Sequence, residues 1–328
     1  MANIELDDTL RRSMVRAWHD YLTAVDPIRP DLHRFSRRLT GNIWDAEDLV
    51  QETLLRAFGH LSQVLHRIEN PRAYVLRVAA NLWIDIVRRR EADTAALSGE
   101  ASRAVHEPPT SPPASQRVEI REAGARLMQS LAPQERAAVL LADVFDMSIE
   151  ETASVLATTS GAVKAALHRG RERLRNADAP PARRRATPPP AVLDRFVERY
   201  SARDLPGLLA LMSDNARIEM HGLETESGRA AFERERGWFH HNFYNPFDGS
   251  PSTLRWQTAV FEGEPIILVF DSVDGALVSV MRLEERAGLV ERIRVYALCP
   301  DTVREVGESL GCTVRTLGYR FPFEVSAT

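Results

Sequence analysis

The sequence predicts a multi-domain chain in which two all-α blocks precede an α+β domain. Apolar residues recur at helical spacing from about Leu6 to Arg90 and again from Arg117 to Arg175. The remainder opens with helical segments and then carries strand-like apolar runs such as PIILVFDSV and LVERIRVYAL. Proline-rich segments separate these blocks, and 328 residues are enough for two or three cores. The predicted limits in chain order are 1–90, a flexible linker 91–116, 117–176, a Pro/Arg-rich linker 177–190, 191–300 and a tail 301–328.

Composition restricts the classes of function. The formal net charge is −4, so contact with nucleic acid has to come from local basic patches. There is no apolar run of about 18 residues or more and no signal-peptide pattern, which predicts a cytoplasmic protein without a membrane span. Cys299 and Cys312 are expected to be reduced thiols. No metal-ligand spacing surrounds them, and we expect neither a metal nor a cofactor.

The stretch Ser148–Arg175 predicts a helix-turn-helix. Apolar residues at helical spacing flank an interruption, TTSG, at 158–161, and Thr159 or Ser160 can cap the second helix. The cations of that helix suit phosphate contact and base reading in the major groove of DNA. The alternative is a solvated arginine face on an ordinary amphipathic helix. The basic residues are Lys164, His168, Arg169, Arg171, Arg173 and Arg175.

Two patterns in the first block combine charged, polar and aromatic residues. In 45–58, Leu49, Thr53 and Ala57 are expected on one stripe, beside an acidic-polar face. In 71–90, aromatic residues precede a basic cluster, a mixture suited to single-stranded or melted DNA. The alternatives are a solvated acidic face, core positions for the aromatics, and arginines that favour a helix C-terminus. The acidic-polar face comprises Glu47, Asp48, Gln51 and Glu52, and the aromatics are Tyr74 and Trp83.

Together these segments resemble regions 2 and 4 of an extracytoplasmic-function sigma factor of the sigma-70 family. The resemblance rests on DAEDLVQETLLRAF and NPRAYVLRVAANLWIDIVRRR, followed by LAPQERAAVLLADVFDMSIEETASVLATTSGAVKAALHRGRERLR, and covers roughly the first half of the chain. It implies a non-enzymatic sigma factor that binds core RNA polymerase, through the β′ clamp helices and the β subunit. It also implies promoter DNA as a partner, transcription initiation as the activity, and a monomer when free.

The resemblance further implies roles for individual residues. The residues that would contact core polymerase are Asp48, Gln51 and Glu52. Those that would bind the −10 element are Asn81, Asp85, Arg88, Arg89 and Arg90. Those that would read the −35 element are Ser160, Lys164, Ala165, His168, Arg169 and Arg171. Ala165 and Ala166 stand where many relatives carry Ser and Arg, so the preferred promoter sequence is left open.

The third block resembles the SnoaL-like fold of polyketide cyclases, a cystatin-like cone in which a curved antiparallel sheet wraps around helices and an apolar pocket. The resemblance rests on AVLDRFVERYSARDLPGLLALMSDNARIEMHG, a helical GRAAFERERGWFHH and the strands that follow. It implies a domain that regulates the sigma regions in cis, by intramolecular contact. HGLETESGR stands where one subfamily has a glycine-rich motif, which places the chain outside that subfamily. The possible pocket for a small-molecule ligand comprises Trp238, His241, Tyr244, Trp256 and Tyr296.

Other interpretations stay open. The aromatic residues of the third block can be core residues, whereas a cyclase would hold a group such as His221 or Asp271 in an apolar cavity. The whole chain can also be a helix-turn-helix repressor, or a ligand-binding or enzymatic SnoaL-like protein with a docking module. The tail predicts a helix at 301–311 and then an aromatic end that packs back on a domain. That end comprises Tyr319, Phe321 and Phe323.

Overall fold

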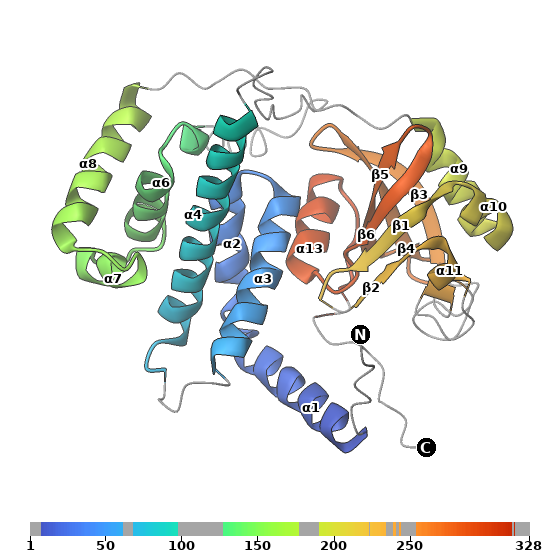
Figure 1. Cartoon of the computed structure of the whole chain (residues 1–328), viewed down its shortest axis with the longest axis horizontal. Helices are drawn as coiled ribbons and strands as arrows, with labels where there is room; N and C mark the ends of the chain where they lie inside the picture. The colour runs from blue at the N-terminus through green and yellow to red at the C-terminus, as the bar shows by residue number, and fades with distance from the viewer. Residues whose placement is uncertain are drawn as a thin grey trace. The chain divides into compact units, whose positions relative to one another are not determined.

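The computed structural model describes residues 8–61, 68–97, 127–176, 190–222, 224–233, 239–240, 243, 254–316 and 318. The chain forms two compact units (Figure 1). In the described residues, the first unit holds the helices of both N-terminal blocks and the second holds the C-terminal block. The predicted fold class, all-α blocks followed by an α+β block, is confirmed.

Helices account for the regular structure described in the first unit. The first block forms α1 (Asp8–Val25), α2 (Arg29–Thr40), α3 (Ile43–Leu61) and α4 (Pro71–Leu97). The second block forms α6 (Pro133–Val139), the π-helical turn η1 (Leu140–Val144), α7 (Ile149–Val155) and α8 (Ser160–Asn176). The predicted start of the linker at Glu91 is wrong, because α4 continues to Leu97. The segment EADTAAL is rich in strong helix formers and contains no proline, so nothing ends the helix at Arg90.

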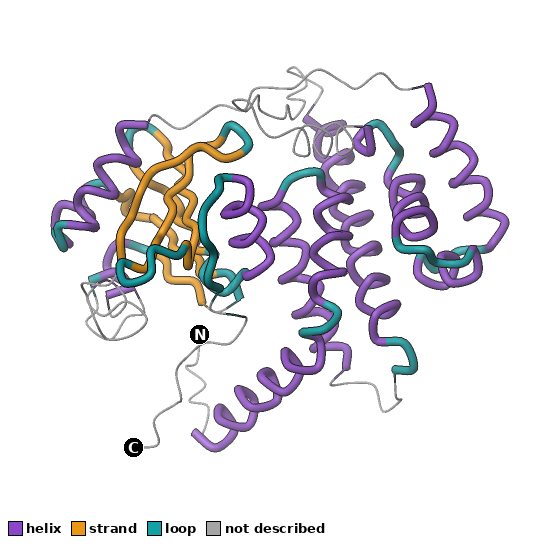
Figure 2. Tube along the Cα trace, turned by 180° about the vertical axis from the view of Figure 1, so that it is seen from behind, coloured by secondary structure: helices purple, strands orange, loops and turns teal. Residues whose placement is uncertain are grey.

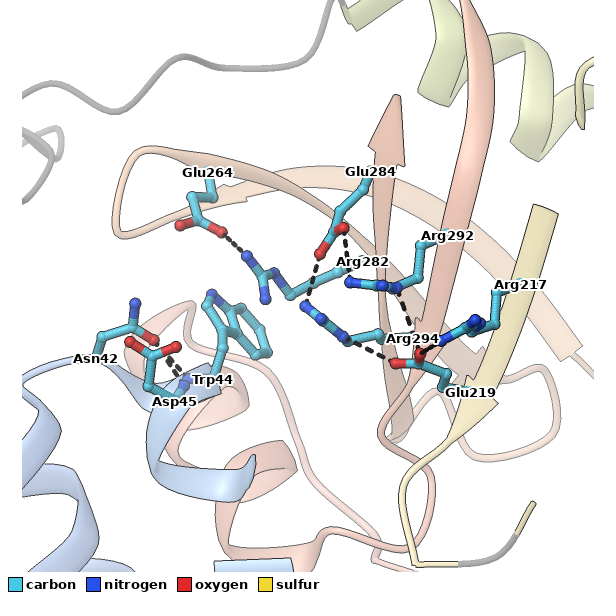
Figure 3. Close-up of polar contacts among 10 residues, drawn as sticks. All are labelled: Asn42, Trp44, Asp45, Arg217, Glu219, Glu264, Arg282, Glu284, Arg292 and Arg294. Carbon is cyan, nitrogen blue, oxygen red and sulfur yellow. Dashed lines mark hydrogen bonds and ion pairs between the residues drawn. The ribbon is translucent and has the colours of Figure 1, made fainter. Parts of the chain in front are cut away.

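Two short signals position α3. Gly41 ends α2 in the left-handed conformation, with φ 77°, which glycine adopts without strain. The Asn42 side chain then caps α3, because its Oδ1 accepts hydrogen bonds from the backbone N–H groups of Trp44 at 2.8 Å and Asp45 at 3.0 Å (Figure 3). From this cap, Leu49 and Ala57 of the predicted stripe are turned into the core. The stripe is therefore confirmed.

The two blocks of the first unit share one apolar core. Helix α4 lies between α2 and α3 on one side and the second block on the other (Figure 1). Phe35 of α2 and Phe145, which follows η1, meet edge to face with ring centroids 5.6 Å apart. Leu140, Leu141 and Val155 join the same buried cluster. Burial of this apolar surface stabilises the contact between the blocks.

In its described residues, the second unit contains a six-stranded sheet and helices (Figure 2). Its helices are α9 (Pro190–Ser201), α10 (Leu205–Ala210), α11 (Arg229–Phe232) and α13 (Pro300–Ser309). Its strands are β1 (Met212–Met220), β2 (Glu224–Ser227), β3 (Leu254–Phe261), β4 (Glu264–Asp271), β5 (Leu277–Arg286) and β6 (Leu289–Val295), in the order β2-β1-β6-β5-β4-β3. Strands β3 to β6 form an antiparallel meander. The expected antiparallel sheet contains one parallel pair, β1 with β6, which the long connection between these strands permits.

The two faces of this sheet differ in chemistry, since side chains alternate along each strand. Ile218, Ile293 and Val295 lie in the apolar core with residues of α9, α10 and α11, as the SnoaL-like resemblance implies. The opposite set forms a network of ion pairs (Figure 3). In it, Arg294 pairs with Glu219 at 3.1 Å and with Glu284 at 2.7 Å.

Three local expectations met different outcomes. Of the helix expected over 228–241, the structure describes α11 (Arg229–Phe232) and helical residues at 239–240. Strand β2 was not expected, because ETES has no apolar alternation. The tail helix is confirmed as α13. The aromatic end at Tyr319, Phe321 and Phe323 lies outside the described residues.

Candidate nucleic-acid interface

The predicted helix-turn-helix is formed by α7 and α8. A reciprocal capping box starts α7: the Ser148 Oγ accepts from the Glu151 N–H at 3.1 Å, and the Glu151 carboxylate accepts from the Ser148 N–H at 2.8 Å. The hydrogen bond from the Ser148 backbone N–H, and then that from the Ser148 side chain, lower the pKa of the Glu151 carboxyl. Ala157 makes the turn in the left-handed conformation, with φ 50°. Thr159 caps α8 through its Oγ1, which accepts from the Ala162 N–H at 3.2 Å.

Helix α8 has one buried and one exposed face. Val163, Leu167 and Gly170 lie on the buried face. The opposite strip consists of Gly161, Lys164, Ala165 and His168, and all four are exposed. We call these four residues the reading strip. Its shape suits a major groove, because small residues alternate with a cation and an imidazole that can reach base edges.

The arginines of α8 flank the reading strip and are held by carboxylates. Glu135 of α6 receives Arg169 Nε at 2.9 Å on one oxygen and Arg173 Nη1 at 2.7 Å on the other. Its side chain is only 5% exposed. On the other flank, Asp143 accepts from Arg171 Nε at 3.0 Å and Nη2 at 2.5 Å, and these hydrogen bonds raise the pKa of Arg171. Neither carboxylate was predicted, because the pairing of each with an arginine of α8 depends on how α6, η1 and α8 pack together.

The predicted −35 residues therefore fall into two groups. Lys164, Ala165 and His168 belong to the reading strip, whereas Arg169 and Arg171 are ion-paired at its sides. The structure places the sixth residue, Ser160, at the start of α8, where it is half-buried.

A second polar surface follows α4. Asn81, Asp85, Arg88 and Arg89 are exposed at helical spacing on one side, and Arg90 is exposed at the next position. All five residues predicted to bind the −10 element are therefore exposed. Trp83 is not on this surface, because it is 5% exposed and packs under the Arg136 guanidinium, 5.1 Å from the ring centroid. The core interpretation is thus correct for Trp83.

The predicted polymerase-binding residues lie on α3. Asp48 is exposed, Gln51 is half-buried, and Glu52 is 46% exposed and pairs with Arg56 at 2.7 Å. Glu47 does not belong to this face, so that expectation is wrong. Its carboxylate is 1% exposed and pairs with Arg29 of α2 at 3.1 Å, which compensates the charge inside the core.

A cleft of about 1050 Å³ opens beside this acidic face. Its walls come from α3, from α4 and from the segment that leads into α6. Its lining combines apolar side chains with acidic side chains from α3. The lining includes Asp48, Glu52, Trp83, Gln129 and Arg136.

Arg136 connects the two blocks across this cleft. It is 9% exposed, and its Nη1 donates to the Leu39 carbonyl of the first block at 2.6 Å. Its Nη2 donates to the Gln129 carbonyl of the second block at 2.8 Å. Burial lowers the pKa of the guanidinium to about 10. We call this set of interactions the Arg136 contact.

The structure separates the pocket residues predicted for the third block. Trp256 lies against the apolar core, with its ring 4.8 Å from that of Tyr200. Tyr296 is buried outside that cluster and stacks on His221 at 4.5 Å. Trp238, His241 and Tyr244 lie outside the described residues. In the parts of the chain that the structure describes, no group of three His, Cys, Asp or Glu side chains could hold a metal ion. No helix among them is both long and apolar enough to cross a membrane.

Comparisons with known proteins match both helical blocks. Residues 24–92 match the family model of sigma-70 region 2, and residues 122–174 match that of sigma-70 region 4. The ECF RNA polymerase sigma factor SigE of Mycolicibacterium smegmatis is 36% identical over 149 residues, which are 44% of this chain and 56% of that protein. The ECF RNA polymerase sigma factor SigM of Bacillus subtilis is 30% identical over 145 residues, 44% of this chain and 86% of that protein.

The similar solved structures include another sigma factor. The extracytoplasmic-function sigma factor SigJ of Mycobacterium tuberculosis aligns with 86% of this chain and 98% of its own, at 22% identity and a TM-score of 0.33. The chain spans little more than half, 56%, of the SigE relative.

Proposed function

The chain belongs to the ECF RNA polymerase sigma factors, and from this we propose that it binds core RNA polymerase and directs promoter-specific transcription initiation. The observation that carries the proposal is the reading strip of α8, which presents Lys164, Ala165 and His168 opposite the buried face of a capped helix-turn-helix. We assign this strip to the −35 element. We propose that the protein acts in the cytoplasm, where core polymerase and promoter DNA meet.

We assign the exposed side of α4 to the −10 element. An amide such as Asn81 can satisfy the edge of an unpaired base, while Arg88 and Arg89 hold the phosphate backbone. The face of α3 with Asp48, Gln51 and Glu52 is the docking site for core polymerase, at the β′ clamp helices. Its carboxylates attract a basic partner surface and orient the encounter.

This assignment requires the two helical blocks to separate. The −10 and −35 elements are about 25 base pairs apart by their names, or about 85 Å of duplex. In the free protein, the hydrogen bond from Arg136 to Leu39 and its stacking on Trp83 hold the blocks together. Between Leu97 and Leu127 there are 29 residues, enough to span roughly 100 Å when extended. The proposed mechanism is therefore a population shift, in which polymerase and promoter favour the open state.

We propose that the C-terminal domain regulates the sigma regions in cis and performs no catalysis. Tethering supports this role, because a covalent linker gives the domain a high effective concentration near its target. The sites of intramolecular contact, and any small-molecule ligand, are part of this proposal.

Transcription in vitro tests the proposal. Purified core polymerase and the full chain are incubated with a pool of genomic promoters, and the transcripts are sequenced. We expect transcripts from a narrow promoter class. The double substitution Asp48→Ala/Glu52→Ala should abolish them, whereas Asp20→Ala, an exposed acidic control on α1, should not. Absence of specific transcripts with the unaltered chain would refute the proposed function.

A further inference from the structure

Helices α6 and α8 meet at a glycine. A Cβ atom at Gly170 would lie only 2.8 Å from Val139 Cγ2 and 3.6 Å from Glu135 Cβ. Glycine thus lets the two helices approach closely. Because they do, the Glu135 carboxylate reaches Arg169 and Arg173, which lie on either side of Gly170 in the sequence. The same carboxylate accepts from the Ala132 N–H at 3.3 Å, which fixes its position at the start of α6.

The opposite flank of α8 is held in a similar way. Arg171 donates two hydrogen bonds to Asp143, one to each carboxylate oxygen. Such a two-pronged pair fixes the plane of the guanidinium as well as its position. Asp143 belongs to η1, so the π-helical turn supplies the second carboxylate.

The angular positions of these arginines match a groove. At about 100° per residue, Arg169 and Arg171 lie about 160° apart around α8, with the reading strip between them. A helix is about 10–12 Å across with its side chains, and the major groove is about 12 Å wide. When the strip faces the bases, the two flanks face the phosphates of opposite strands.

We propose that Glu135 and Asp143 are positioning residues that hold Arg169, Arg173 and Arg171 as phosphate clamps on the two sides of the reading strip. The inference rests on the proposed function and assigns a task to carboxylates that do not touch DNA. Each guanidinium has five N–H donors, and the ion pairs use only one or two of them. The remaining donors are available to phosphate, and the side chains are already ordered before DNA binds.

The direction in which a substitution changes the affinity for DNA distinguishes a positioning role from a purely electrostatic one. A carboxylate near DNA repels phosphate, so neutralising a bystander carboxylate should leave binding unchanged or strengthen it. Neutralising a positioning carboxylate should weaken binding, although the protein becomes more positive. Glu172 is the matched bystander: it is exposed on α8, and no hydrogen bond or ion pair of its carboxylate occurs within the described residues.

The test uses holoenzyme made with the full chain and a fluorescent promoter that the unaltered protein transcribes. Affinity is measured over a range of salt concentrations for Glu135→Gln, Asp143→Asn and the control Glu172→Gln. We expect Glu135→Gln to weaken binding about tenfold, since two long side chains regain freedom, and Asp143→Asn about threefold. The control should bind at least as tightly as the unaltered protein, and the preferred promoter class should stay the same.

Thermal unfolding shows whether each variant is folded. Should Glu135→Gln disturb α6, Asp143→Asn decides alone, because its side chain is 33% exposed and outside the core. A folded variant that binds as tightly as the unaltered protein, or more tightly, would overturn the inference. That result leaves the sigma function intact, whereas loss of specific transcription by the unaltered holoenzyme would refute the function itself.

Discussion

Removing the Arg136 side chain should loosen the packing between the two helical blocks. Arg136→Ala deletes the hydrogen bond that the charged guanidinium donates to Leu39 of the first block and its stacking on Trp83 of α4. The bond to Gln129 lies within the second block and does not count toward the contact between the blocks. Hydrogen bonds from charged groups contribute about 1.5–3 kcal/mol each, and stacking on Trp83 adds about 0.5–2 kcal/mol. The cost of burying the guanidinium, which its lowered pKa reflects, offsets part of this sum.

The expected net loss across the contact between the blocks is about 2 kcal/mol, which makes separation of the blocks roughly 30-fold more frequent. Hydrogen–deuterium exchange measures this locally. Amides of 133–145 should exchange up to about 30-fold faster, while those of β4 and β5 should not change. Arg175→Ala, an exposed arginine of α8 that bonds the Arg171 carbonyl, serves as the control. Unchanged exchange at 133–145 in the folded Arg136→Ala protein would refute the reasoning.

The other predictions concern the turn of the helix-turn-helix, a buried tyrosine and the reading strip. Ala157→Gly should stabilise the first unit by about 0.5–1 kcal/mol in urea unfolding, because glycine accepts φ 50° without strain. The control Ala162→Gly, within α8, should destabilise the unit, and a loss of stability with Ala157→Gly would contradict the argument. Burial raises the pKa of Tyr200 to about 12, so its contribution to the stability of the second unit is complete below about pH 10 and falls between about pH 10 and 12. Tyr200→Phe should remove this loss of stability at alkaline pH, as measured by urea unfolding with near-UV circular dichroism. The same dependence of stability on pH in the variant and the unaltered protein would contradict the prediction. Lys164 is the only lysine in the sequence, so promoter DNA should protect it from an amine-reactive reagent in the holoenzyme; equal labelling with and without promoter would exclude it from the groove.

Local patterns predicted much of the fold, because each depends on neighbours in sequence. The period of α8, its Thr159 cap and the buried stripe of α3 follow from residue spacing and from short-range hydrogen bonds. The strands β3 to β6 were also predictable, since their apolar runs are bounded by turn residues. The parallel pairing of β1 with β6 was not, because it depends on tertiary contacts between distant segments.

In the candidate site, too, local features were predictable from the sequence and tertiary contacts were not. Exposure of Lys164 and His168 follows from the helical period. The burial of Glu47 against Arg29 and the clasp of Glu135 on two arginines depend on which helices pack together. From the sequence alone, a carboxylate in an amphipathic helix is expected to face solvent, because the helix that packs against it is not known. The sequence therefore indicated the exposed face of α8 but not the groups that order it.

The spacing between the two promoter elements tests the central claim most directly. The claim is that one chain reads both elements at once while it holds core polymerase. On a promoter that the holoenzyme transcribes, roughly five base pairs inserted between the −35 and −10 elements would turn them about half a helical turn apart. We predict that the holoenzyme then loses specific transcription, whereas the same insertion upstream of the −35 element has no effect. Undiminished transcription from the promoter with altered spacing would contradict the account.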